Sequence, residues 1–262
     1  MAIPLFISAA TACRYIGDKR DSPRKRLDIM LGYQKTNVSK LDRTYLPILS
    51  QLFDDEDEDK ERRISEFQEV VGSIILLETP LSIASLAQLL DIHKEDISCR
   101  LDSLHSVLSI SANEDVLVRL LHLSFRNFLL DPQKREKSPF WVDEMETHER
   151  LASKCLKLMS SSKGLRQNIC DLLSPGALKS KIDEIEQCLP ADLQYACHYW
   201  VQHLQRSEAQ LCDNDHVHKF LQKHFLHWLE ALSLSGKTPD SVGIVTALQS
   251  MVVSDLEPAS LT

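Results

Sequence analysis

Histidines and cysteines crowd the C-terminal third of the sequence, and side chains of these types can bind metal ions. Six histidines fall within thirty residues, in the same stretch as Cys197 and Cys212. On a helix, His224 and His227 would project from one face, a spacing that zinc accepts. No CxxC pair and no paired acidic ligand accompanies them. We therefore interpret these histidines as polar or half-buried side chains between aromatic anchors, and we predict no metal site.

Motifs of catalysis and of phosphate binding are missing from the sequence. It contains no nucleophile elbow and no HExxH. It also contains no GxxxxGK[ST] loop, so it lacks the backbone amides and the lysine that hold a triphosphate. A hydrophobic strand ending in an acidic residue, which would hold Mg²⁺, is absent as well. We expect that the chain is not an enzyme and that it binds no cofactor by itself.

The seven cysteines indicate an intracellular protein. Their number is odd, no two are spaced as CxxC, and a chain of 262 residues needs no disulfide framework. We interpret them as reduced and mostly buried thiols. The longest strongly apolar stretch, around Val70–Leu77, is far too short to span a bilayer. The N-terminal segment lacks the basic region of a signal peptide, so we expect a cytoplasmic protein without membrane contact.

Composition favours a helical protein with an acidic balance. Hydrophobic residues make up 43% of the sequence, and seven glycines are few for this length, which argues against a loop-rich β protein. The formal net charge of −8 repels nucleic acid at long range. Residues 14–43 are locally basic. We interpret them as a solvated helical surface, and the alternative is a docking face for an acidic partner.

Helical periodicity is clearest in the second quarter of the sequence. Apolar residues recur at helical spacing in 64–75, and Pro80 ends that helix because the residue before a proline avoids the α region. Ser82 is placed to cap a second helix over 83–90. Lys94–Ser106 has the spacing of a third helix. An acidic run at 54–59 precedes the first of these helices and is typical of a solvated loop.

The hydrophobic period then changes to that of strands. Val107–Ile110 and Val116–Leu121 are rich in leucine and β-branched residues, and the polar connector Ser111–Asp115 between them predicts a hairpin. Ser124 is placed to cap a short helix over Phe125–Leu130. Helices followed by a hairpin in this order predict a winged helix.

The rest of the sequence predicts helices with aromatic and leucine-rich inner faces. The expected helices are Asp143–Ser160, Ile182–Gln187, one that begins at Pro190, Asp215–Leu232 and Thr238–Val253. The predicted fold class is therefore mainly α, with a winged-helix domain that carries one small β-hairpin, followed by an α-helical domain.

Several long blocks of the sequence resemble one family, the fungal NACHT-type STAND NTPases, which are switch ATPases and GTPases of vegetative incompatibility and innate immunity. PLFISAATACRYI resembles the segment that follows their NTPase core, and LLHLSFRNFL resembles the His-x-Ser-Phe-x-x-Phe-Leu motif that ends their winged helix. FWVDEMETHERLASKCLKLMS, QCLPADLQYACHYWVQHLQ and HKFLQKHFLHWLEALSLSGK resemble the helical blocks that precede their sensor repeats. The resemblance covers nearly the whole chain.

The resemblance implies one functional residue. His122 matches the winged-helix histidine that contacts the phosphates of bound ADP in the resting state of such switches, and a histidine can donate a hydrogen bond to a phosphate oxygen. Ser124, Phe125 and Phe128 match the motif around it, as cap and core anchors. Asn127 stands where the family often has an acidic residue, which puts any salt bridge there in doubt.

The resemblance also implies a domain order. Residues 1–45 would be a helical lid segment that follows an NTPase core absent from this chain, 46–132 the winged-helix domain, and 133–262 the C-terminal α-helical domain. Without the phosphate-binding core and the sensor repeats, the chain is expected to be a truncated gene product, a split relative or a fragment. ADP and ATP are then cofactors of the full-length family only.

The predicted function is a non-catalytic regulatory module that closes over ADP bound to an NTPase core. Its expected partner is that core or another protein, with oligomerisation in the full-length family. The alternative is a winged-helix nucleic-acid-binding regulator. Its recognition helix would be Lys94–Ser106, in which acidic residues outnumber the basic ones, so phosphate neutralisation is poor and we expect no nucleic acid partner.

Overall fold

A computed structural model describes residues 3–18, 21–52, 59–111, 113, 115–135, 137–172 and 182–251. The chain forms two compact units. The N-terminal unit comprises residues 1–87 and 92–147, and the C-terminal unit comprises 88–91 and 148–262. The acidic run predicted to be a solvated loop lies outside the described residues except for Asp59.

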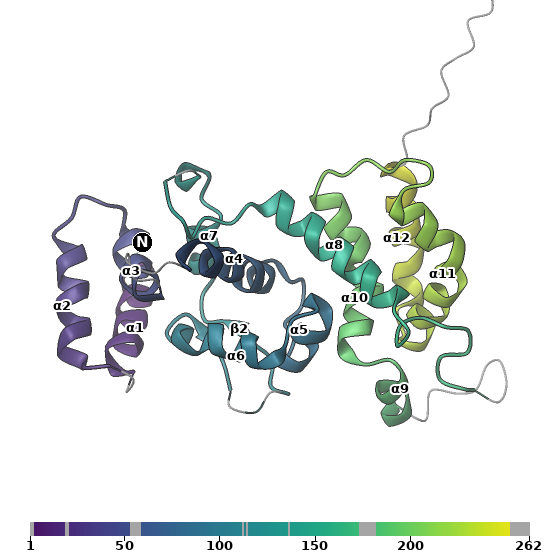
Figure 1. The fold of residues 1–262 in the computed structure, drawn as a ribbon, viewed down its shortest axis with the longest axis horizontal. Coiled ribbons are helices and arrows are strands. Elements are labelled where there is room, and N and C mark those ends of the chain that lie inside the picture. The colour runs from purple at the N-terminus through teal and green to yellow at the C-terminus, as the bar shows by residue number, and fades with distance from the viewer. Residues whose placement is uncertain are drawn as a thin grey trace, which may run out of the picture. The chain divides into compact units, whose positions relative to one another are not determined.

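The first helices of the N-terminal unit pack against one another (Figure 1). They are α1 (Ile3–Gly17), α2 (Pro23–Gln34) and α3 (Lys40–Leu49). Arg26 of α2 is buried and donates to the Tyr15 carbonyl of α1 at 2.6 Å, and it pairs with Asp18 at 3.2 Å. Ser39 and Asp42 form a capping box at the start of α3, which satisfies backbone amides that a helix start otherwise leaves without partners.

The remainder of the unit combines helices with a two-stranded antiparallel sheet. Its elements are α4 (Lys60–Leu76), α5 (Ile83–Leu90), α6 (Lys94–Leu101), β1 (Leu108–Ser109), β2 (Arg119–Leu120) and α7 (Leu123–Leu129). Leu108 faces Leu120 across the sheet, and Ser109 faces Arg119. An isolated bridge joins Leu117 to Ser82, just before α5.

The predicted mainly helical fold with one small hairpin is confirmed. Ser82 caps α5 as expected, since its hydroxyl accepts the Ser85 amide at 3.2 Å. The third predicted helix is shorter than expected, because α6 ends at Leu101 and a 3₁₀ turn over Asp102–Leu104 tightens the chain into β1. The strands are also shorter, spanning only Leu108–Ser109 and Arg119–Leu120.

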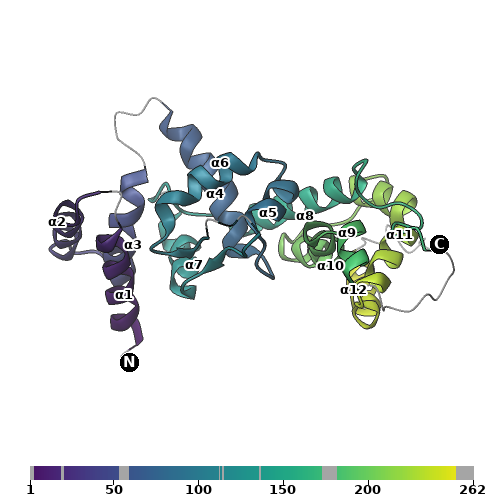
Figure 2. The ribbon, with the colours of Figure 1, turned by 90° about the horizontal axis from the view of Figure 1, so that it is seen from below.

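The C-terminal unit is built around a tryptophan core. Its elements are α8 (Glu144–Ser160), which begins at the unit boundary, α9 (Ile182–Cys188), α10 (Ala191–Arg206), α11 (His216–Leu234) and α12 (Thr238–Met251). α10 contacts both α11 and α12, and these two contact each other (Figure 2). Trp200 and Trp228 are fully buried with ring centroids 5.5 Å apart, and the Trp228 indole donates to the Cys197 carbonyl at 2.7 Å.

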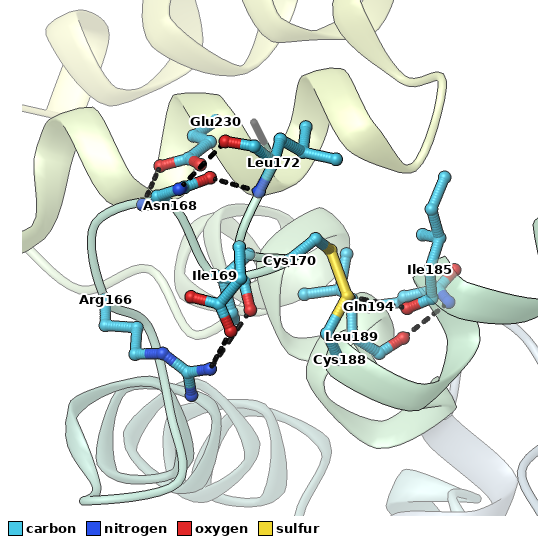
Figure 3. Close-up of a disulfide and its surroundings, with 11 residues drawn as sticks. Arg166, Asn168, Ile169, Cys170, Leu172, Ile185, Cys188, Leu189, Gln194 and Glu230 are labelled. Carbon is cyan, nitrogen blue, oxygen red and sulfur yellow. Dashed lines mark hydrogen bonds and ion pairs between the residues drawn. A yellow bond between two sulfur atoms is a disulfide. The ribbon is translucent and has the colours of Figure 1, made fainter. Parts of the chain in front are cut away.

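The prediction that all cysteines are reduced is wrong. Cys170 and Cys188 form a disulfide with their Cα atoms 5.4 Å apart (Figure 3). The two residues are 18 positions apart, so only tertiary packing brings them together. The free cysteines are not mostly buried either, since Cys155 and Cys197 are buried whereas Cys13, Cys99 and Cys212 are exposed.

Within the described part of the chain, every helix is too short or too polar to cross a lipid bilayer.

Candidate functional site

His122 occupies the junction between β2 and α7. Its backbone is extended, with φ −158° and ψ 141°, and it is the N-cap residue of α7. The imidazole Nδ1 accepts the Ser124 amide at 2.9 Å. The predicted cap, Ser124, is therefore wrong: the helix begins two residues earlier than expected, and a histidine nitrogen takes the role that a serine oxygen usually has.

A chain of hydrogen bonds fixes the tautomer of His122. Because Nδ1 accepts a backbone N–H, it carries no proton in the neutral ring, and the proton lies on Nε2. The Ser124 hydroxyl lies 2.7 Å from the same Nδ1 and 2.6 Å from the Tyr45 hydroxyl. In this arrangement Tyr45 donates to Ser124, and Ser124 donates to Nδ1. The Nε2–H is left as a donor without a partner among the described residues.

Aromatic packing holds α7, and with it His122, against α3. Phe125 and Phe128 are almost fully buried, and their rings lie 5.1 and 5.2 Å from the Tyr45 ring. Burial raises the pKa of Tyr45, while its hydrogen bond to Ser124 acts in the opposite direction. The tyrosine therefore remains a neutral donor at physiological pH. Contacts from α3 thus set the orientation of the imidazole.

His122 lines a pocket formed by α1, α3 and the hairpin. The cavity holds about 180 Å³. Its polar lining comes from Thr11, Arg14, Ser106 and His122, and its apolar walls include Ile7, Ala10, Val107 and Phe125. Because ligand pockets for drug-sized molecules measure roughly 300–1,000 Å³, this cavity accommodates a phosphate or a small ring but not a whole nucleotide.

Two polar side chains of this pocket, Ser106 and Arg14, differ in burial and in their partners. Ser106 is 5% exposed, and its hydroxyl has no hydrogen-bond partner in the described part of the chain. A buried hydroxyl without a partner costs about 1–3 kcal/mol. Arg14 is exposed and, among the described residues, makes no ion pair. Sequence reasoning singled out His122 but missed Arg14 and Ser106, because α1 and the hairpin meet only in the tertiary structure.

Apolar side chains surround the mouth of the pocket. Phe6 is 83% exposed and Leu121 36% exposed, and both line the pocket. Leu123, the next residue after His122, is 66% exposed. Exposed apolar side chains gathered at a polar pocket are typical of a surface that another protein covers.

Two histidines of the C-terminal unit, His224 and His227, lie close together on α11. Nδ1 of His224 and Nδ1 of His227 lie 3.5 Å apart, and the His224 ring stacks on Phe220 with centroids 5.5 Å apart. No group of three or more potential metal ligands occurs among the residues that the structure describes.

A buried histidine network was not anticipated from the sequence. His203 and His148 are both fully buried with their Nδ1 atoms 2.8 Å apart, and Nε2 of His203 lies 2.7 Å from the Tyr195 hydroxyl. Burial, with the nearby charges of His148 and Arg206, lowers the pKa of His203 to about 3. His203 therefore stays neutral, and its hydrogen bonds link α8 to α10 in the core.

Comparison with known proteins gives a distant relative. The vegetative incompatibility protein HET-E-1 of Podospora anserina is 24% identical to this chain over an alignment of 271 residues. The alignment covers 94% of this chain and 19% of HET-E-1. No family model and no solved structure matches the chain. The chain is thus a distant homologue of a fungal vegetative incompatibility protein and spans about a fifth of that protein's length.

Proposed function

We propose that this chain is a non-catalytic regulatory module of a NACHT-type signalling NTPase in the cytoplasm. In the proposed mechanism, a winged helix closes over ADP bound to an NTPase core, and His122 donates its Nε2–H to a phosphate oxygen. The observation that carries the proposal is the fixed tautomer, since the Ser124 amide holds Nδ1 and directs the proton to Nε2.

The winged-helix assignment is supported by the order of elements. Three helices, α4 to α6, precede the β1–β2 hairpin. An isolated bridge pairs Leu117, just before β2, with Ser82, the residue before α5. The distant homology to HET-E-1, a vegetative incompatibility protein, also supports a regulatory role in general terms.

The pocket supports the need for a partner. Its volume of about 180 Å³ is too small for a nucleotide, so the rest of an ADP molecule would lie against another surface. The exposed Phe6, Leu121 and Leu123 provide apolar area for a core to cover. ADP would then bias the module toward the closed state through contacts that the open state lacks, and release would permit oligomerisation.

The alternative function, a nucleic-acid-binding regulator, has weaker support. Its recognition helix would be α6, whose first turn contains Glu95 and Asp96. The basic residue in the last turn of α6, Arg100, pairs with Glu66 at 3.0 Å. A helix with this charge balance neutralises few phosphates.

Calorimetry tests the proposal. ADP is titrated into the chain alone, into a separately expressed NACHT NTPase core, and into their mixture. The proposal expects no binding by the chain alone and tighter binding by the mixture than by the core. His122→Ala should remove this gain by about 10- to 100-fold in Kd, the effect of one hydrogen bond to a charged group.

A matched variant controls for loss of any surface histidine. His105 is also on the N-terminal unit and 43% exposed at its side chain, so His105→Ala should leave the affinity of the mixture unchanged. Tight ADP binding by the chain alone, or no association with a core, would contradict the proposal. Binding of duplex DNA that weakens steeply with salt would favour the alternative.

A further inference from the structure

The Cys170–Cys188 disulfide joins two elements that differ in how firmly they are held (Figure 3). Cys170 belongs to the turn over residues 166–172 that follows α8. Cys188 is the last residue of α9, just before α10. The consequence of breaking the bond depends on what else holds each side.

The turn at 166–172 is held independently of the disulfide. The Asn168 side chain accepts the Leu172 amide at 2.8 Å and donates to the Leu172 carbonyl at 3.2 Å. The backbone N–H of Asn168 donates to the Glu230 carboxylate of α11 at 3.1 Å. The Arg166 guanidinium donates to the Ile169 carbonyl at 3.1 Å. Figure 3 shows these bonds around the turn. The turn therefore keeps its position without the sulfur bridge.

Helix α9 is short, and its described side chains are only partly buried. It is seven residues long, well below the roughly 12–15 residues at which an isolated helix becomes marginally stable. None of its side chains that the structure describes, those of residues 185–188, is fully buried. The next residue, Leu189, is fully buried and accepts the Gln194 side chain at 2.8 Å, so the anchor to α10 begins only there.

The two bridge cysteines are only half-buried, and the thiols of this unit's core do not compete with them. Cys170 and Cys188 are both half-buried, so a reductant can approach them. Burial raises the pKa of Cys155 and raises that of Cys197 to about 12, so neither forms the thiolate that attacks a disulfide. The Trp200–Trp228 pair of the core lies on α10 and α11, neither of which contains a cysteine of the bridge.

We propose that Cys170–Cys188 is a reversible redox site, whose reduction by a dithiol protein releases α9 while the rest of the C-terminal unit stays folded. A thiolate of the reductant attacks one sulfur and forms a mixed disulfide, and the reductant's second thiol then displaces it. The S–S bond of the chain breaks, and Cys170 and Cys188 each end as a thiol. The reductant loses two electrons and two protons and ends as a disulfide.

Amide hydrogen exchange on the full chain, read by mass spectrometry, tests this proposal. The oxidised protein is compared with protein reduced by a thioredoxin-type dithiol protein. Reduction should speed exchange of the α9 amides by about a hundredfold, which corresponds to the local stability that a bond closing a loop of this length contributes. Peptides from 166–172, α10 and α11 should keep their protection.

Variants separate the bridge from other cysteines. Cys188→Ser should show fast α9 exchange with or without reductant. Cys212→Ser removes an exposed free thiol of the same unit and should keep the full redox dependence. Should Cys188→Ser fail to fold, the comparison of oxidised and reduced wild type still decides. Seven titratable thiols in the denatured, unreduced protein, a bond that a dithiol protein does not reduce, or equal α9 exchange in both states would each overturn the proposal.

Discussion

The buried His203 should make the C-terminal unit sensitive to mild acid. Its ring lies between the Tyr195 hydroxyl at 2.7 Å and Nδ1 of His148 at 2.8 Å, with no exposure to solvent. A proton added to His203 would place a positive charge in the core. The charged groups that shift its pKa, His148 and Arg206, both oppose that charge.

The sign and size of the effect follow from the pKa of His203, which falls from 6.5 to about 3 on folding. Because the folded value is the lower one, the unfolded chain binds the proton more readily. The stability from the neutral ring is fully present above pH 6.5 and is lost as the pH falls toward 3. At pH 5 the loss is about 2 kcal/mol, at roughly 1.4 kcal/mol for each pH unit below 6.5.

Urea unfolding at pH 7 and pH 5, followed by tryptophan fluorescence, measures this loss. His203→Gln lowers the stability at pH 7 but removes the titrating ring, so its stability should fall by about 2 kcal/mol less between the two pH values. The variant His216→Gln changes an exposed histidine of the same unit and should keep the wild-type pH dependence. An equally steep fall for His203→Gln and wild type would refute the assignment of the acid sensitivity to His203.

Further predictions concern the N-terminal unit and can be checked by urea denaturation. Tyr45→Phe removes the 2.6 Å hydrogen bond to α7 and should lower the free energy of unfolding by about 1 kcal/mol, and an unchanged value would mean that the hydroxyl does not hold α7. Ser39→Ala removes the capping box of α3 and should cost about 0.5–2 kcal/mol, whereas Ser22→Ala, at an N-cap without a side-chain bond, should cost only a few tenths. Phe125→Ala, at 1% exposure, should cost about 3–5 kcal/mol, while Leu123→Ser, at 66% exposure, should change stability by less than about 0.5 kcal/mol. Equal effects within either pair would contradict the packing described for it.

Periodicity and capping chemistry made most helices predictable. The apolar spacing in 64–75 corresponds to α4, and Pro80 lies between α4 and α5 as expected. Ser82 caps the next helix because its hydroxyl is correctly placed within three residues of the amide it accepts. Signals of this kind depend on neighbours in the sequence, so the sequence alone contains them.

The details of the candidate site were not predictable in the same way. The family resemblance pointed to His122, but serine is the usual cap residue, and nothing local shows that Nδ1 accepts the amide of Ser124. The pocket needs Arg14 and Ser106 from segments about ninety residues apart. Such a constellation exists only after α1 has packed near the hairpin.

The sequence by itself determined the helical class, the positions of most helices and the place of the small hairpin. Tertiary structure decided the tautomer of His122, the burial of His203 against His148 and the pairing of Cys170 with Cys188. The physical reason is the sequence distance between the interacting groups. Helix periodicity and caps act over a few residues, whereas desolvation, tautomer choice and disulfide pairing depend on which distant groups packing brings within a few ångströms.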